Sequence, residues 1–353
     1  MRKPLKRIFK FSSGFLAVHL VTIAILSNIQ IRDYSLLQLI THDNSMSGGG
    51  GGYTQLRFRE AEHYGPVDIL FVGSSRGIMA FDVDEFSRNG LRTFNLGSTG
   101  QCPLNSYFLL ENFVDRLNPR LVVFESNCLT LESDGLESFF DLNRNMNMSE
   151  VLVKMAWAVE NPHALTALAS RLVWLPVQPM EKNKQCTFPG IKYIEGGFIK
   201  AEINNKKEFE DKARIIKINP RQLEYLDKSL KLLKERNISV LLTIVPETIE
   251  QKNSFSNYEE IINALDSLSK VRTTSFIDFS SNQGLNSRNH FCDFHHLNAA
   301  GAELFSRHLI NYIYTTEELS TVLPERKLLL VQKPAYVNSD SLILIRTIHD
   351  PAM

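Results

Sequence analysis

Short, almost entirely apolar runs recur along the chain, and they constrain its fold more than any other feature. The clearest is Val67–Val72 (VDILFV), which ends directly at Gly73. Similar runs are found at Leu121–Phe124, Val240–Val245 and Phe276–Phe279, with a weaker one at Arg92–Leu96. A run this short, without polar alternation, is typical of a strand covered on both faces.

Helical candidates separate these runs. They span Ser106–Leu117, Arg221–Glu235 and Ala299–Tyr314. Strands that alternate with helices indicate βαβ units, which build a parallel sheet with right-handed crossovers and helices on both faces. We therefore expect an α/β fold, a three-layer α/β/α sandwich of the flavodoxin-like type.

The N-terminus has the charge pattern of a membrane anchor. The first ten residues contain five basic side chains and no acid, and an uncharged stretch follows from Phe11 to Ile31. Insertion machineries recognise this pattern, and Leu26–Ile29 is a poor cleavage site. We expect an uncleaved transmembrane helix, with the rest of the chain periplasmic or otherwise extracytoplasmic. The alternative is an amphipathic or buried helix, since His19 and Thr22 interrupt the apolar run.

The remaining composition divides the chain into further parts. After the basic end and anchor at 1–31, a linker at 32–60 contains the glycine run Ser47–Gly52, which is typical of a flexible tether. The expected α/β domain covers 61–320, and a C-terminal extension covers 321–353. Within the domain, about 130–219 is too long for a crossover loop, so we interpret it as an insertion that shapes the ligand site.

Composition excludes several classes of protein. Lys plus Arg and Asp plus Glu are 39 each, so the net charge is zero, which gives no sign of a nucleic-acid partner. An apolar share of 43% with 22% charged residues excludes a disordered chain and a multi-span membrane protein. The four cysteines contain no Cys-x-x-Cys pair, which disfavours a zinc ribbon or thioredoxin-like site and leaves their pairing open.

A serine-containing turn, Gly73–Gly77 (GSSRG), follows the first expected strand at its carboxyl end. Open α/β sheets place their ligand sites at this edge. A serine in such a turn presents its hydroxyl to solvent and its N–H near a helix N-terminus, which suits a nucleophile and an oxyanion donor. The same turn could instead bind a phosphate or merely cap the helix. Arg76, just after the turn, is expected to be a solvated surface charge.

A second candidate segment lies far away, where Asp293 and His296 precede the last expected helix. A nucleophilic serine needs a base, and the base needs a carboxylate that fixes its tautomer. Taken singly, His296 could be a structural histidine and Asp293 an ordinary helix N-terminal acid. Their coincidence with a serine turn favours catalysis.

Three segments together resemble a known family. They are Ile69–Arg76 (ILFVGSSR), Asn95–Gly100 (NLGSTG) and the pattern Asp293-x-x-His296-Leu297-Asn298-x-x-Gly301-Ala302. Their order resembles that of the conserved blocks of SGNH/GDSL hydrolases, and more particularly of the membrane-anchored bacterial branch that acts on acyl groups of cell-envelope polymers. The resemblance covers about 67–129 and 240–314 and leaves the insertion and the extension unmatched.

The resemblance implies a role for each matching residue. Ser75 would be the nucleophile, His296 the base and Asp293 its orienting acid. The oxyanion hole would consist of the N–H of Ser75, the N–H of Gly100 and the side-chain amide of Asn127. This chain departs from the pattern at Glu125–Cys128, which lacks the usual Gly-x-Asn-Asp, so Asn127 could equally be a loop-capping side chain.

Neither a metal nor a cofactor is expected. His290, Cys292, His295 and His296 cluster in sequence, but their spacing matches no common zinc site, and a metal on His296 would remove the base. The chain contains no P-loop and no dinucleotide fingerprint.

These observations favour a serine esterase or acyltransferase that acts on an acyl group, in the first place acetyl, of an envelope polysaccharide or related ester. Its partners would be the acylated substrate, the membrane and, as an option, a membrane acyltransferase. Two alternatives stay open. One is a non-catalytic, membrane-anchored glycan-binding or assembly factor with the same fold, and the other is a phosphate binder at Gly73–Gly77.

Overall fold

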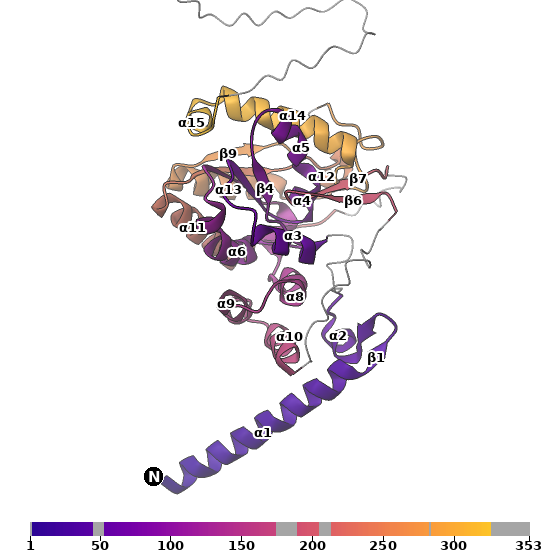
Figure 1. Cartoon of the computed structure of the whole chain (residues 1–353), viewed down its shortest axis with the longest axis vertical. Helices are drawn as coiled ribbons and strands as arrows, with labels where there is room; N and C mark the ends of the chain where they lie inside the picture. Colours follow the sequence, from indigo (N-terminus) through magenta and orange to yellow (C-terminus); the bar gives the residue numbers. More distant parts are fainter. Residues whose placement is uncertain (1, 45–52, 174–188, 205–212, 282–283, 326–353) are drawn as a thin grey trace, which may run out of the picture.

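A computed structural model describes residues 2–44, 53–173, 189–204, 213–281 and 284–325 (Figure 1). The glycine tether expected at Ser47–Gly52, Cys186 and most of the extension at 321–353 lie outside the described residues.

The centre of the molecule is a parallel sheet of five strands in the order β4-β3-β5-β8-β9. The strands are β3 (Ile69–Val72), β4 (Thr93–Asn95), β5 (Leu121–Glu125), β8 (Ser239–Ile244) and β9 (Ser275–Asp278). The expected parallel α/β sheet is confirmed. The chain reverses its direction of travel across the sheet between β3 and β5, and ligands of such folds bind at the carboxyl edge at this point.

Helices cover both faces of the sheet. One face carries α6 (Pro103–Leu117), α11 (Pro220–Glu235) and α13 (Tyr258–Arg272); the other carries α4 (Ser75–Ala80), α5 (Val83–Arg88) and α14 (Ala299–Thr315). The fully buried strand β3 shows why both layers are needed. Leu70 and Val72 pack into the first layer, while Ile69 and Phe71 pack into the second. Burial of each such side chain stabilises the fold by about 1.5–3 kcal/mol, so exposure of either face of the strand to water would destabilise it.

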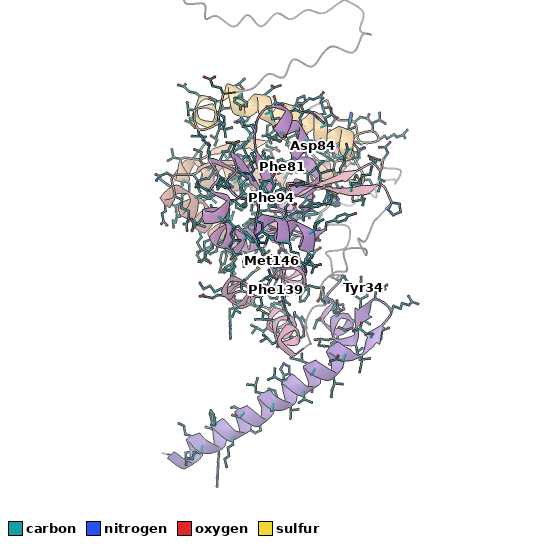
Figure 2. All side chains as sticks on the ribbon, in the orientation of Figure 1. Tyr34, Phe81, Asp84, Phe94, Phe139 and Met146 are labelled. Carbon is teal, nitrogen blue, oxygen red and sulfur yellow. The ribbon has the colours of Figure 1, made fainter. Side chains whose placement is uncertain are left out.

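Large aromatic side chains fill the two layers. Phe94 lies in the layer with α6, and Phe81 stacks on Phe71 in the layer with α14 (Figure 2). The first layer continues into the insertion, where Phe139 and Met146 are also buried.

The segment interpreted as an insertion folds into helices and a hairpin. These are α7 (Cys128–Glu132), α8 (Leu136–Asn145), α9 (Glu150–Ala158), α10 (Pro162–Val173), β6 (Ile191–Ile194) and β7 (Phe198–Ala201). The hairpin of β6 and β7 is antiparallel, and its Gly196 carbonyl accepts a hydrogen bond of 2.7 Å from the N–H of Asn95. The hairpin therefore lies beside β4, at one edge of the sheet.

The N-terminal helix α1 (Arg2–Asn28) leads away from the sheet, with α9 and α10 between them (Figure 1). Its segment Pro4–Asn28 is long and apolar enough to be a membrane span or a signal sequence. It is almost entirely exposed, which argues against a buried core helix. Short elements follow: β1 (Gln30–Ile31), β2 (Tyr34–Ser35), α2 (Leu36–Thr41) and α3 (Thr54–Ala61), and later in the chain α12 (Ile249–Asn253) and α15 (Glu317–Ser320).

Candidate active site

The turn between β3 and α4 gives its two serines different environments. Ser74 is buried and caps α4, and both its N–H and its hydroxyl donate to Oε2 of Glu125, at 2.7 and 3.0 Å. Ser75 is the first residue of α4 and is only half-buried. The turn is therefore held by Ser74, which leaves the hydroxyl of Ser75 free to face another group.

That group is His296, which is 221 positions away in sequence. Ser75 Oγ lies 2.8 Å from Nε2 of His296, and Nδ1 of the same ring lies 2.8 Å from Oδ2 of Asp293. The other carboxylate oxygen of Asp293 accepts the backbone N–H groups of His295 and His296, at 2.9 and 2.8 Å. The structure thus brings together all three residues that the sequence pattern singled out.

The electrostatics of this group suit proton transfer. Burial alone would raise the pKa of Asp293, but its hydrogen bond from His296 and the nearby histidine charges hold that pKa well below its usual range. An ionised Asp293 accepts the Nδ1–H of His296, which leaves Nε2 as an acceptor for the Ser75 hydroxyl. The arrangement can remove the proton from Ser75 as this oxygen attacks an electrophile.

Two backbone N–H groups near the turn are candidate donors to an oxyanion. Ser75 begins α4, so its N–H has no acceptor within the helix. Gly100 lies in the loop after β4 with φ +59°, a conformation that favours glycine. Ser98, in the same loop, donates its N–H to the Gly73 carbonyl at 3.3 Å, which ties this loop to the serine turn.

The side chain of Asn127 is occupied elsewhere. Its Oδ1 caps α7 by accepting the N–H groups of Leu129 and Thr130. Its Nδ2 donates to Oε1 of Glu125 at 2.7 Å and to Oγ of Ser74 at 3.3 Å. Both amide hydrogens of Asn127 are therefore engaged by Glu125 and Ser74, so Asn127 has no N–H left for an oxyanion. Its side chain instead stabilises the serine turn.

Sequence reasoning noted Glu125 only as a departure from a family pattern, yet it organises this part of the site. Its side chain is buried and binds both Ser74 and Asn127. A Cβ atom at Gly73, where φ is +155°, would lie 2.5 Å from Oε2 of Glu125. The Cβ atom and the backbone carbonyl of Glu125 would also be within 2.6 and 3.0 Å of it, so the close approach of Glu125 requires glycine at position 73.

The expectation that Arg76 is a solvated surface charge is wrong. Arg76 is 3% exposed and forms an ion pair of 2.7 Å with Glu247, which follows β8. Burial raises the pKa of Glu247, and Arg76 partly offsets the rise. The next residue, Thr248, donates its N–H and hydroxyl to the carbonyl of Phe294, at 3.1 and 2.9 Å. This buried pair thus connects the serine turn to the loop that carries His296.

Glu137, at the start of α8, is a site residue that the sequence did not indicate. A Cβ atom at Gly100 would lie 2.7 Å from Oε2 of Glu137, so this carboxylate lies directly against the loop of the second N–H donor. No cation pairs with it among the described residues. Loss of water around the carboxylate, and then the charge of Asp141, raise its pKa. The insertion therefore places an unpaired carboxylate at the rim of the site.

Asp293, His295 and His296 form a cluster of side chains that could bind a metal ion. Ligand atoms of Asp293, His295 and His296 lie within 4.8 Å of one another, but both ring nitrogens of His296 already contact Asp293 and Ser75. Burial raises the pKa of Cys292 to about 12, and its Sγ donates a hydrogen bond to the carbonyl of Leu297 at 3.6 Å. A metal here would have to displace one of the contacts of His296.

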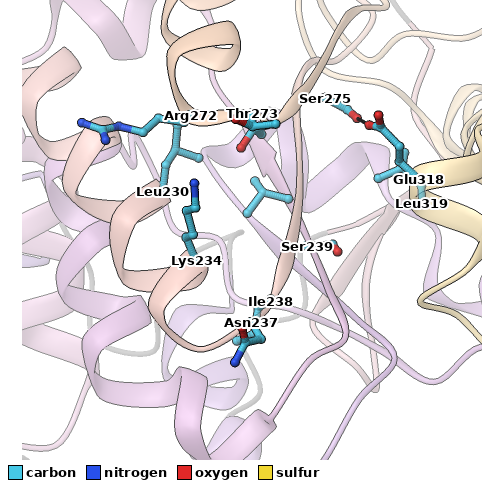
Figure 3. A pocket seen from close by; sticks show the side chains of 12 residues that line it. Leu230, Lys234, Asn237, Ile238, Ser239, Arg272, Thr273, Ser275, Glu318 and Leu319 are labelled. Carbon is cyan, nitrogen blue, oxygen red and sulfur yellow. Dashed lines mark hydrogen bonds between the residues drawn. The ribbon is translucent and has the colours of Figure 1, made fainter.

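A cavity lies at the amino edge of the sheet, opposite the edge that carries Ser75 and His296. It has a volume of about 500 Å³ and is lined by residues such as Lys234, Asn237 and Ser239 at the start of β8, and Arg272 and Glu318 (Figure 3). Ser75, Asp293 and His296 do not line this cavity.

Comparisons with known proteins give one partial match to a protein-family model and similarities to solved structures at low sequence identity. A protein-family model matches residues 197–318, a segment that contains Asp293 and His296 but not Ser75. No curated protein sequence matches the chain. A GDSL-like lipase from Bacteroides thetaiotaomicron is 12% identical, with 75% of this chain and 98% of that chain covered and a TM-score of 0.39. An acetyl xylan esterase is 13% identical, with coverage of 69% and 98% and a TM-score of 0.38. The strand order and the serine and histidine at the carboxyl edge of the sheet are those of an open, doubly wound α/β fold with its candidate site at that edge.

Proposed function

We propose that this protein is a serine-dependent enzyme of acyl-ester chemistry. The observation that carries the proposal is the 2.8 Å contact between Ser75 Oγ and His296 Nε2, with Asp293 bound to the other ring nitrogen. A phosphate-binding turn would leave these residues without mutual contacts. Their alignment therefore supports an activated nucleophile over a phosphate site.

The geometry supports a two-step reaction. Ser75 Oγ attacks the ester carbonyl carbon while its proton passes to Nε2 of His296, and Asp293 stabilises the resulting imidazolium. The N–H groups of Ser75 and Gly100 stabilise the oxyanion. His296 then donates its proton to the departing alkoxide oxygen, which leaves an acyl group on Ser75. In the second step His296 deprotonates water or a hydroxyl acceptor, whose oxygen attacks the acyl carbon. The bond between this carbon and Ser75 Oγ then breaks, and His296 returns its proton to Ser75 Oγ.

The finer proposal concerns place and substrate. We propose that α1 is retained as an anchor and that the α/β domain lies outside the cytoplasm, where it removes or transfers an acyl group, in the first place acetyl, on an envelope polysaccharide. The basic end of α1 and its apolar length support this orientation. Transfer would need an acyl donor, which a membrane acyltransferase partner could supply.

The test is hydrolysis of p-nitrophenyl acetate by the full chain in detergent. Ser75→Ala should lower kcat by at least about 10³-fold, because the nucleophile and its base act as a unit. Ser320→Ala, on helix α15 and outside the candidate site, is the matched control and should retain wild-type activity. Wild-type activity that survives in Ser75→Ala would rule out the proposed nucleophile.

A second candidate function is a non-catalytic glycan-binding or assembly factor. The side chains of Glu125 and Asn127 favour it, because they bind each other beneath the turn and Asn127 donates no N–H to the site. A fluorophosphonate probe separates the two functions, since it labels only an activated serine. Labelling of the wild type that disappears in Ser75→Ala indicates an enzyme, and a wild type that is not labelled indicates a binding protein.

A further inference from the structure

The outer surface of α9 and α10 carries apolar side chains that the fold does not use. We define the α9–α10 surface by Val153 and Trp157 of α9 and Leu172 of α10. Trp157 is 67% exposed and Leu172 is 71% exposed. The opposite side of α9 is already satisfied, because Leu152 and Met155 are fully buried in the core. These exposed side chains therefore need another explanation than packing of the domain.

The position of α1 indicates what covers this surface. The uncharged part of α1, Phe11–Asn28, is about 27 Å long at 1.5 Å per residue, whereas a bilayer core is about 30 Å thick. If α1 spans the membrane, its last turns must therefore lie within the bilayer or at its outer edge. The buried residues of this part of α1 are Ile23 and Ser27, and α10 and α2 are among the elements that pack against α1. The contact with α10 thus brings α10 to the outer face of the bilayer.

We infer that the α9–α10 surface lies in the lipid headgroup layer beside the anchor, so that the occupant of this surface is the bilayer itself. This inference rests on the proposed insertion of α1. Tryptophan suits such a position, because its ring combines a large apolar area with an N–H that stays hydrated at the interface. Lys154, an exposed neighbour of Trp157 on α9, pairs with Glu150 at 3.0 Å in the structure and would exchange this partner for a lipid phosphate at the bilayer surface.

The surface is also connected to the candidate active site. α10 packs against α8, and α8 carries Glu137, which lies against Gly100. Docking on the bilayer would consequently fix the insertion, and with it one wall of the site, relative to the membrane.

Tryptophan fluorescence can test this inference in the full chain. The sequence contains two tryptophans, so a Trp174→Phe variant leaves Trp157 as the only one. The protein is reconstituted in phosphatidylcholine vesicles that carry bromine either near the headgroups or deep in the acyl chains. We expect Trp157 to lose fluorescence with the shallow bromines, to lose less with the deep ones, and to be shielded from aqueous iodide.

The matched control places the single tryptophan on α14, away from α1. It is Asn311→Trp in a Trp157→Phe, Trp174→Phe chain, because Asn311 is exposed. This residue should be quenched by iodide and not by brominated lipid. If Trp157 behaves like this control, the surface faces water and the inference is wrong. If Trp157 is shielded from both quenchers, a protein covers it, which also overturns the inference. Failure of α1 itself is distinguishable, because the chain would then not co-float with the vesicles.

Discussion

The candidate site has two sides that are built differently. The side of Ser75 and His296 depends on the parallel sheet and on buried polar contacts, with Glu125 beneath the turn and the Arg76–Glu247 pair beside it. The side of Gly100 and Glu137 depends on a loop and on the first residues of α8 in the insertion. Under the proposed function, we expect the sheet side to determine whether the reaction occurs, and the insertion side to adjust it for a particular substrate.

The largest effect on the sheet side should come from Asp293→Asn. The amide cannot stabilise the imidazolium of His296, and it favours the wrong tautomer of the ring. The expected result is a fall in kcat of about 10⁴-fold at neutral pH. Ester hydrolysis over a range of pH measures it, with circular dichroism to show that the variant is folded. A loss of less than tenfold would mean that Asp293 does not orient the base.

The buried ion pair should affect stability most. Arg76→Met leaves the carboxylate of Glu247 buried without its cation, which should cost about 3–5 kcal/mol in the free energy of unfolding. The cost should be smaller at lower pH, because a protonated Glu247 no longer needs a partner. Urea unfolding measures both effects.

The double variant Arg76→Met, Glu247→Leu is the control for that prediction. Removing both charges should recover most of the lost stability. If Arg76→Met alone costs less than about 1 kcal/mol, the value of an exposed pair, the pair does not hold the sheet side together.

The contrast between the two sides also explains what the sequence could predict. The strand ending at Gly73, and the spacing of Asp293 and His296, are local patterns, and the parallel sheet dictates that the two segments meet at its carboxyl edge. The role of Arg76 depends on Glu247, which is 171 positions away. No local pattern distinguishes a buried arginine from a solvated one. Sequence reasoning therefore singled out the three residues that the structure brings together, and it missed the buried ion pair beside them.

The same limit applies to the insertion side. Glu137 begins a helix in a segment that matches no family pattern, so only the fold places it against Gly100. Asn127 shows the converse. Its residue type suits an oxyanion donor, but the neighbouring Glu125 binds its amide, and this contact follows from side-chain conformations that a sequence does not specify.

A smaller effect should appear in the pH dependence of stability. Burial, and then the charges of His296 and Arg76, lower the pKa of His295 to about 3 from 6.5. Between these values the unfolded chain binds a proton that the folded chain does not, so folding stability should fall as pH drops from about 6.5 toward about 3. His295→Gln should flatten this part of the curve. Urea unfolding of both proteins at several pH values tests it, and parallel curves would show that His295 titrates normally.

The smallest effect, and the one that separates the two sides, is expected for Glu137→Gln. The carboxylate lies against the Gly100 loop, so it repels the oxyanion that the Gly100 N–H would stabilise. Removing one charge that water largely screens is worth about 1 kcal/mol, or roughly a fivefold gain in kcat with a neutral acetyl ester. Burial raises the pKa of Glu137, so its carboxyl group is neutral at low pH, where the wild type should match the variant in kcat. As pH rises through that pKa, kcat of the wild type should fall below that of the variant. The unfolding free energy should change by less than about 0.5 kcal/mol, as for other exposed side chains. Unchanged kcat at every pH would show that Glu137 is outside the field of the reacting carbonyl, and the insertion would then contribute shape but no charge to the site.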